Sequence, residues 1–304
     1  MKLATFDVGT NTVLMLAVEA SPHRKPVPLL ELSRITRVGK GVDRTGKLDP
    51  DAVLRTLDTI VEFAAMARAV GVEKMVGVAT SAIRDAGNGA KFIREVKERA
   101  GVELQVITGR EEAELSRLAV VRGLALDPNL RLLIADIGGG STELIRSQGD
   151  NINMVSLQMG SVRLTERIIH HDPPTADEIA ALKTAIDQQL DHLGWLYRPD
   201  ALVGIAGTVT TVCAVALGLE GYDSSIVHGH VLSREEVSRT VKRFGELPLA
   251  ERKKLKGLAE ARADVIFAGG MILERIIERF QAPGVIVSDQ GVRWGLMWRE
   301  LECG

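Results

Sequence analysis

The segment Asp136-Ile-Gly-Gly-Gly-Ser-Thr-Glu143 constrains the fold of this chain more than any other. An apolar run with β character, residues 130–135, precedes it, and a second alternating run, residues 142–147, follows it. This order predicts a β-hairpin closed by a glycine turn. The glycines leave backbone N–H groups bare and able to curl around an anion, and the acids at the two ends suit a metal or a water. A plain glycine-rich β-turn is the alternative interpretation.

A second segment of the chain has the same order. Asp7-Val-Gly-Thr-Asn-Thr12 follows an apolar run, residues 3–6, and precedes another, residues 13–18. Two like hairpins, one opening each half, indicate a duplicated domain whose loops face each other across a cleft. Two N–H-rich loops in that arrangement would hold a phosphate chain from both sides. The pair resembles the phosphate loops of the actin, Hsp70 and sugar-kinase superfamily.

The balance of charge argues against a general nucleic-acid-binding protein. Lys and Arg total 38 and Asp and Glu total 40, so the chain has no overall basic field that would attract nucleic acid. A polyanionic substrate would have to be attracted by a local basic patch. The length of 304 residues is sufficient for two ordinary domains.

Cysteine usage and hydropathy predict a cytoplasmic protein with no membrane partner. The two cysteines, Cys213 and Cys303, do not make a disulfide framework, which fits a reducing compartment. The N-terminal residues lead directly into a strand without a signal-peptide pattern. No apolar run approaches the length of a membrane span.

The order of the predicted elements is that of an α/β protein with duplicated ribonuclease H-like domains flanking a cleft. The boundary is predicted at the Asp127-Pro128 turn, giving domains of residues 1–127 and 128–304. A terminal helix near residues 290–304 is expected to be able to pack back on the first domain. Thr175 and Ser233, each followed three residues later by Glu, predict capping boxes at two helix starts. Residues 259–280 are predicted as one long helix.

Two predicted strand ends in the first half carry polar groups that suit phosphate chemistry. Thr80-Ser-Ala-Ile-Arg84 ends in a guanidinium whose planar fork suits a phosphate, although a solvated loop arginine is the alternative. Ile107-Thr-Gly-Arg-Glu-Glu-Ala113 opens a helix at the next strand end. Acids in a first turn are ordinary complements of the helix dipole. A carboxylate there could also orient and deprotonate a water for attack on phosphorus.

The second half has a third small-residue turn and several weaker candidates. Gly204-Ile-Ala-Gly-Thr208 precedes a helix and is either an anion seat or plain strand–helix packing. His228-Gly-His230 is a weak metal signature, since no Cys or acid is near it in the sequence. Ala268-Gly-Gly270 is faintly similar to the adenosine-binding glycines of kinases in the superfamily, but it lies in a helical pattern, which favours close helix packing. The sequence assigns no role to Arg262 and Asp264, and His170-His171 are expected to be capping or solvated.

Basic residues near predicted strand ends or loops of the first half are candidates for the patch that a polyanion needs. An ordinary solvated surface is the alternative interpretation. These residues are Arg34, Arg37, Lys40, Lys47, Arg84 and Arg110.

Segments in order over nearly the whole chain resemble the exopolyphosphatase/guanosine pentaphosphate phosphohydrolase (Ppx/GppA) family. The chain looks like the short form, without the C-terminal helical domains of longer members. Trp294 stands where the family pattern predicts an acid after Arg293. The matching segments are Asp7-Val-Gly-Thr-Asn11, Arg37-Val-Gly-Lys-Gly41, Ala79-Thr-Ser-Ala-Ile-Arg84, Ile107-Thr-Gly-Arg-Glu-Glu-Ala113, Asp136-Ile-Gly-Gly-Gly-Ser-Thr-Glu143, Gly160-Ser-Val-Arg-Leu164, Ala206-Gly-Thr208, His228-Gly229 and Ser288-Asp-Gln-Gly-Val-Arg293.

The resemblance implies roles for individual residues. Glu112 matches the base that activates water, and Arg84 matches the arginine on the phosphate under attack. Asp136 and Glu143 match acids near a magnesium ion and the water, and Asp7 is a further candidate ligand. A substrate patch is expected at Arg37 and Lys40. The implied phosphate-binding residues are Asp7, Gly9, Thr10, Asn11, Gly138, Gly139, Gly140, Ser141, Gly207 and Thr208.

The resulting functional prediction is a Mg²⁺-dependent phosphoanhydride hydrolase. Its substrate would be inorganic polyphosphate, guanosine pentaphosphate (pppGpp), or both, and the sequence does not separate them. The alternatives are an ATP-dependent small-molecule kinase of the same superfamily and a non-catalytic sensor that binds guanosine tetra- or pentaphosphate. A homodimer is an option that the sequence leaves open.

Overall fold

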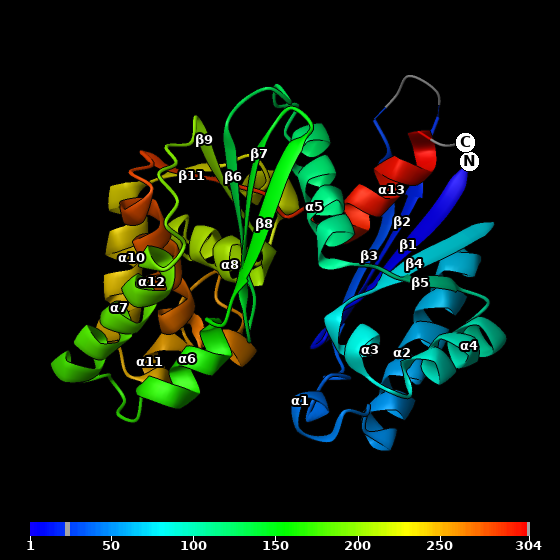
Figure 1. Ribbon diagram of the computed structural model, residues 1–304, viewed down its shortest axis with the longest axis horizontal. Coiled ribbons are helices and arrows are strands. Elements are labelled where there is room, and N and C mark those ends of the chain that lie inside the picture. The colour runs from blue at the N-terminus through cyan, green and yellow to red at the C-terminus, as the bar shows by residue number, and fades with distance from the viewer. Residues whose placement is uncertain (22–24, 303–304) are drawn as a thin grey trace. The chain divides into compact units, whose positions relative to one another are not determined.

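The computed structural model describes residues 1–21 and 25–302, whose course is shown in Figure 1. The chain forms two compact units, Met1–Ala119 together with the segment that begins at Val292, and Val120–Gly291. The division falls inside a helix, α5 (Gly109–Gly123), ahead of the predicted boundary at the Asp127-Pro128 turn. Cys303 lies outside the described residues.

The sheet of the first unit has the strand order β3-β2-β1-β4-β5. Consecutive strands β1, β2 and β3 pair antiparallel, β4 pairs parallel to β1, and β5 pairs parallel to β4. Side chains alternate between the faces of a strand, so Leu3, Thr5 and Asp7 of β1 share one face. The strands are β1 Lys2–Val8, β2 Thr12–Glu19, β3 Val27–Ile35, β4 Lys74–Ala79 and β5 Glu103–Val106.

Helices cover both faces of this sheet. α2 and α4 pack on the face that carries Phe6 and Met15, whereas α13 packs on the opposite face through Trp294 and Met297 (Figure 1). Trp294 is therefore a core residue, 5% exposed, which accounts for its departure from the expected acid. Besides α5, the helices of this unit are α1 Val42–Thr45, α2 Pro50–Ala69, α3 Ser81–Asp85, α4 Gly89–Ala100 and α13 Val292–Glu302.

The sheet of the second unit repeats the order of the first and adds one strand. Its order is β10-β11-β9-β6-β7-β8, in which β8-β7-β6-β9-β11 corresponds to β3-β2-β1-β4-β5. β9 and β11 run parallel to β6, and β10 is added antiparallel to β11. The repeated order confirms the predicted duplicated α/β fold. The strands are β6 Leu132–Ile137, β7 Thr142–Gln148, β8 Asn151–Leu157, β9 Ala201–Ile205, β10 Val231–Ser233 and β11 Gly284–Val287.

The helices of the second unit begin largely where their caps predict. Thr175 and Ser233 each form a complete capping box, with Glu178 and Glu236 respectively, so both predictions are confirmed. The helices are α6 Ser161–Ile168, α7 Ala176–Asp191, α8 Ala206–Ala216, α9 Ser224–Val227, α10 Arg234–Glu246, α11 Leu249–Arg252, the 3₁₀ turn η1 Glu260–Arg262, and α12 Ile266–Arg279.

The predicted long helix 259–280 is wrong in its first turns. α12 begins only at Ile266, and η1 precedes it. The carbonyl oxygen of Ala263 accepts a hydrogen bond from Nη1 of buried Arg252 at 2.9 Å, an interaction between distant elements that local sequence does not signal. Further along, a Cβ on Gly269 would lie 2.6 Å from Cγ2 of Thr208. The predicted close helix packing around Gly269 is therefore confirmed.

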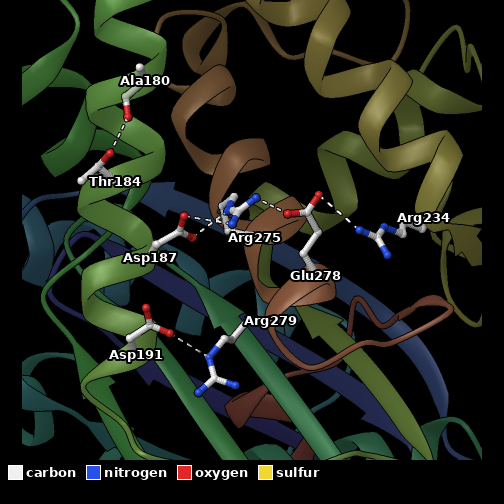
Figure 2. Close-up of polar contacts among 8 residues, drawn as sticks. All are labelled: Ala180, Thr184, Asp187, Asp191, Arg234, Arg275, Glu278 and Arg279. Atoms are coloured by element: carbon white, nitrogen blue, oxygen red, sulfur yellow. Dashed lines mark hydrogen bonds and ion pairs between the residues drawn. The ribbon is translucent and has the colours of Figure 1, made fainter.

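An ion-pair network joins α7, α10 and α12 on the second unit, as Figure 2 shows. Arg275 of α12 donates from Nε and Nη2 to Asp187 of α7 at 2.7 and 2.9 Å, and it also contacts Glu278. Glu278 in turn pairs with Arg234 of α10 at 3.3 Å. Because Arg275 and Glu278 lie one turn apart on α12, this helix is linked to a neighbour on each side.

Candidate active site

In the first unit, three segments that were predicted to carry chemistry end at the same edge of the sheet. The N–H of Thr80 donates to the carbonyl of Val8 at 3.2 Å, and the N–H of Ile107 donates to the carbonyl of Ala79 at 3.1 Å. These bonds continue the parallel pairing of β1, β4 and β5. The first glycine loop, the start of α3 and the start of α5 are therefore neighbours, as expected for ligand groups in an open α/β sheet.

In the first loop, the carbonyl oxygens accept hydrogen bonds from a neighbouring backbone segment, and the N–H groups do not take part in these bonds. Gly9 N donates to Thr12 O at 3.0 Å and closes the turn. The carbonyl of Asn11 accepts from the N–H groups of Thr36 and Arg37, and that of Thr10 accepts from the next segment at Gly39. Within the described part of the chain, no acceptor takes the N–H of Thr10 or Asn11. An anion can occupy such a group of free N–H donors.

Arg84 and the start of α5 lie beside this loop. Arg84 donates from Nη1 to the carbonyl of Ile107 at 3.1 Å and pairs through Nε with Asp85 at 3.3 Å. About a third of its side chain, 35%, stays exposed. The bond to Ile107 brings the guanidinium to the residue that precedes the first turn of α5, where the predicted base lies.

The two adjacent glutamates of α5 differ in their surroundings. The carboxylate of Glu111 accepts from the N–H and the hydroxyl of Thr108 at 2.8 and 2.9 Å. The backbone bond from Thr108, followed by the hydroxyl bond, lowers the pKa of Glu111. Glu111 thus has a structural role as the cap of α5, and the half-buried residue that follows it is Glu112. The capping role of Glu111 supports the choice of Glu112 as the candidate base.

Asp7 is the acid of the first loop, half-buried near the end of β1. Burial raises its pKa to about 6, and the charge of the Arg293 guanidinium opposes that rise. Arg293 opens α13, pairs with Glu31 of β3 at 2.8 Å, and accepts at its carbonyl from the hydroxyl of Thr5 at 2.8 Å. The C-terminal helix therefore contributes a positive charge to the surroundings of Asp7.

In the second unit, the second glycine loop, the third turn and residues 288–290 share one sheet edge. Asp136 pairs with Ile205 in the parallel β6–β9 ladder, and Gly204 pairs with Val287 in the β9–β11 ladder. Ser288 N then donates to Gly204 O at 2.9 Å. The carboxyl ends of β6, β9 and β11 therefore present their following residues side by side.

The second loop repeats the hydrogen bonding of the first. Gly138 N donates to Ser141 O at 3.0 Å, the same closure and distance as in the Gly9 turn. The carbonyl of Gly139 accepts from two successive N–H groups at the start of α6, at 2.9 and 3.0 Å. The N–H groups of Gly139, Gly140 and Ser141 meet no acceptor among the described residues. A Cβ on Gly160 would lie 2.4 Å from the Gly139 carbonyl oxygen, so this close approach requires glycine.

Asp136 and Glu143 are direct cross-strand partners in the β6–β7 hairpin. Ser156 of β8 donates its hydroxyl to Glu143 Oε1 at 2.7 Å and orients that carboxylate. Like charges in opposed positions are destabilising, and a cation relieves that repulsion. The described residues contain no group of three or more His, Cys, Asp or Glu arranged to hold a metal. A carboxylate pair suits Mg²⁺, which commonly keeps waters and substrate oxygens as its other ligands.

The third turn brings in an arginine to which the sequence assigned no role. Ala206 has φ 68°, in the left-handed region, and leads into α8. The guanidinium of Arg262 lies against Gly207, such that a Cβ there would come within 2.3 Å of its Nη2. Among the described side chains Arg262 has no acidic partner. A cation at a helix N-terminus favours the binding of an anion. Gly207 and Arg262 are far apart in the sequence, so the sequence alone does not show that they are neighbours.

Comparison with known proteins decides the family. The model of the Ppx/GppA phosphatase family matches residues 17–303. The chain belongs to the Ppx/GppA phosphatase family. Exopolyphosphatase 2 of Mycobacterium tuberculosis is 32% identical over 310 residues, which cover 97% of each chain. The guanosine-5'-triphosphate,3'-diphosphate pyrophosphatase of Vibrio atlanticus is 28% identical over 309 residues, 98% of this chain and 59% of that protein.

Solved structures of Ppx/GppA proteins have the same fold. The Aquifex aeolicus family member matches with a TM-score of 0.88 at 33% identity, covering 100% of this chain and 98% of that one. An exopolyphosphatase from Cytophaga hutchinsonii matches with a TM-score of 0.85 at 26% identity, covering 100% and 98%. The α/β fold with two actin-like units, predicted from the paired loops, is therefore confirmed.

The predicted basic patch is smaller in this Ppx/GppA protein than the sequence suggested. Arg34 makes a two-point ion pair with Glu62 at 2.5 and 2.8 Å, and Arg110 pairs with Glu114 at 2.9 Å. Both arginines are therefore weaker candidates for binding a polyanion, because a carboxylate of the same unit already neutralises each charge. The exposed patch residues without an acidic partner among the described side chains are Arg37, Lys40 and Lys47.

The histidines do not form a metal site in the described structure. The absence of an acid near His228 in the sequence was misleading, because Nδ1 of His228 lies 2.9 Å from Oδ1 of Asp289. His171 contacts Glu178 at 2.9 Å, and this hydrogen bond is the main cause that lowers the pKa of Glu178 to about 2. His170 donates its backbone N–H to the same carboxylate.

No helix of the described chain combines the length and apolar character that crossing a membrane requires.

Proposed function

We propose that this protein is a Mg²⁺-dependent phosphoanhydride hydrolase that releases the terminal phosphate of inorganic polyphosphate or the 5′ γ-phosphate of pppGpp. Membership of a phosphatase family supports the reaction class. The names of the relatives, an exopolyphosphatase and a guanosine pentaphosphate pyrophosphatase, support the two substrates. The observation that carries the proposal is the pair of glycine hairpins with identical closures, Gly9 to Thr12 and Gly138 to Ser141, whose following N–H groups have no described acceptor.

In the proposed mechanism the protein acts mainly by positioning and by charge, as phosphoryl transfer requires. The loop N–H groups and Arg84 hold the oxygens of the phosphoryl group under attack. Glu112 accepts the proton of a water, the water oxygen bonds to phosphorus, and the bond from phosphorus to the bridging oxygen breaks. The shortened chain leaves with the bridging oxygen, and Glu112 later releases its proton to solvent.

The carboxylates that would hold Mg²⁺ are Asp136 and Glu143, with Asp7 as a further candidate. Their hard oxygen atoms suit this ion, and the cross-strand pairing of Asp136 with Glu143 presents two carboxylates together. When bound, the ion would supply positive charge to the phosphate oxygens. Ser156 would keep Glu143 oriented through its 2.7 Å hydrogen bond.

The decisive experiment measures phosphate release from polyphosphate and from pppGpp, with Mg²⁺ and with a chelator. Glu112→Gln should lower kcat by about 10²–10⁴-fold, the usual contribution of a general base. Glu111→Gln is the matched control. It removes the same charge from the neighbouring residue, whose carboxylate caps the helix. Near-normal turnover in a folded Glu112→Gln variant would refute the assigned role.

Product analysis separates this proposal from the other functions that the fold allows. Free phosphate formed without any acceptor supports hydrolysis, whereas transfer to a small molecule would indicate a kinase. Tight binding of guanosine penta- or tetraphosphate without phosphate release would indicate a sensor. Both substrates should be tested in parallel, because each is named by a different relative.

A further inference from the structure

The three glycines of the second loop have their carbonyl oxygens held in different ways. The Gly138 carbonyl accepts from the N–H of Ser161 at 3.0 Å, and the Gly139 carbonyl accepts from the N–H groups of Val162 and Arg163. The Gly140 carbonyl accepts from Nε of the Arg163 side chain at 2.6 Å. Main-chain donors therefore hold the first two carbonyls, and the Ser161 hydroxyl adds a bond to Gly138 at 3.3 Å. Among the described residues, the third carbonyl is held by a side chain alone.

Each held carbonyl determines the direction of the next N–H group. In a planar trans peptide the C=O and the following N–H point in opposite directions. The bonds to Gly138 and Gly139 thus direct the N–H groups of Gly139 and Gly140, and the bond from Arg163 to Gly140 directs the N–H of Ser141. All three N–H groups point away from α6 and meet no acceptor among the described residues.

The peptide between Gly140 and Ser141 packs on one side against Gly160, since a Cβ there would lie 2.6 Å from the Gly140 carbonyl carbon. The hydrogen bond from Arg163 determines which way its carbonyl oxygen points. Gly140 is exposed and has no Cβ to restrict its backbone. A Cβ placed on it would meet only Nη2 of Arg163, at 3.8 Å. A reversed peptide would present the Gly140 carbonyl oxygen, instead of the Ser141 N–H, to a bound anion, and two negative partners would then face each other.

We propose that Arg163 is a positioning residue of this loop, which keeps the N–H of Ser141 directed at the bound phosphate. The inference rests on the proposed function, because it takes a phosphate as the occupant of the loop. Arg163 lies on the solvent-exposed first turn of α6 and has no carboxylate partner within the described part of the chain. Its one described side-chain hydrogen bond goes to the loop.

Three substitutions separate positioning from a direct effect of charge. In Arg163→Gln the amide nitrogen is the same number of bonds from Cα as the Nε that it replaces, so it can donate to Gly140 without a charge. Arg163→Lys keeps the charge without a donor at that place, and Arg163→Met keeps neither. We expect Met to lower kcat/KM for a short polyphosphate by about 10-fold or more, as for other lost oxyanion donors, and Gln to retain most activity and exceed Lys.

The opposite ranking would overturn the inference. If Lys is active and Gln is as poor as Met, Arg163 acts by its charge on the substrate. If all three variants match the wild type, Arg163 has no role in the loop. The reduction should fall mainly on kcat, because the Ser141 N–H is expected to meet charge that grows in the transition state. A change confined to KM would also contradict the inference.

A second readout does not depend on which substrate is hydrolysed. Inorganic phosphate is titrated into ¹⁵N-labelled protein, and the amide signals of Gly139, Gly140 and Ser141 are followed. In the wild type and in Arg163→Gln all three should shift, whereas in Arg163→Met the Ser141 signal alone should stop responding. An unchanged Ser141 response in Met, or no response of any loop amide in the wild type, refutes the inference. Failure to release phosphate from polyphosphate and pppGpp would instead refute the proposed function.

Discussion

At the scale of single residues, the surroundings of Asp7 disfavour its ionised form and so should destabilise the fold near neutral pH. Its folded pKa of about 6 exceeds the ordinary value of 3.8, so the native state binds the proton more tightly than the unfolded chain. The penalty is absent below both values, grows between them, and reaches about 3 kcal/mol at most above the higher one. Without metal, Asp7→Asn should therefore raise the free energy of unfolding near neutral pH and give little gain at about pH 4.

Urea denaturation in chelator at the two pH values checks this prediction, with phosphate release measured separately. Activity should fall although stability rises, because the carboxylate is lost from the proposed site. A gain of equal size at both pH values would show that the effect does not come from ionisation of Asp7. Arg293→Met is a complementary variant, since its guanidinium opposes the rise of the Asp7 pKa.

Gly207 and Arg262 give a second prediction at this scale. A methyl group on Gly207 would come within 2.3 Å of the Arg262 guanidinium, and the flexible arginine would have to leave the turn. Gly207→Ala should therefore reduce kcat/KM by about the same factor as Arg262→Met, on the order of 10-fold for one lost charge-assisted contact to phosphate. The double variant should be little worse than either single variant. Independent, multiplicative losses would separate the two residues.

At the scale of elements, the structure shows which features a sequence can reveal. Capping at Thr175 and Ser233 is local, since donor and acceptor lie within one turn, and both boxes form as predicted. The Asp-x-Gly hairpins are equally local. By contrast, the break before Ile266 depends on Arg252 reaching the Ala263 carbonyl. Such long-range contacts leave no periodic pattern in the chain.

The same distinction applies to the candidate site. Residue types and strand ends identified the loops, Arg84 and the acids, because each motif is continuous in sequence. The resemblance pointed to Glu112 as the base. The capping role of Glu111 was also readable locally, since Thr108 and Glu111 have the spacing of a capping box and exchange hydrogen bonds.

The sequence missed the position of Arg262 against Gly207, which requires η1 and α8 to be packed together. The pairing of Arg34 with Glu62 is long-range in the same way, whereas that of Arg110 with Glu114 joins residues four apart on one helix and could have been expected.

The network between α7 and α12 gives a prediction about stability alone. Arg275 is 24% exposed in its side chain and makes a two-point bond to Asp187 (Figure 2). Arg275→Met should lower the free energy of unfolding by about 1 kcal/mol, more than a typical surface pair because the geometry is bidentate. A double-mutant cycle with Asp187→Asn isolates the pair. The kcat should not change, and a loss of activity in the folded variant would place the network in the catalytic machinery.

At the scale of the whole molecule, the two units share the same turn and differ in the residues beside it. Both loops close from glycine to the third residue beyond it at 3.0 Å. In the cross-strand position that Glu143 occupies opposite Asp136, the first unit has Leu14 opposite Asp7. The first unit instead carries Arg84 and Glu112 at its strand ends. The residues named in the proposed mechanism therefore belong to both units, and the paired acids belong to one of them.

This division of tasks predicts strong non-additivity between the units. When two groups serve the same chemical step, removing both lowers kcat little more than removing either one alone. Glu112→Gln in the first unit and Asp136→Asn in the second should each lower kcat, by about 10²-fold or more. The double variant should fall far short of the product of the two losses. Glu111→Gln combined with Asp136→Asn is the control, and its effects should multiply. If the Glu112 and Asp136 losses multiply as well, the two units do not act on the same phosphoryl group.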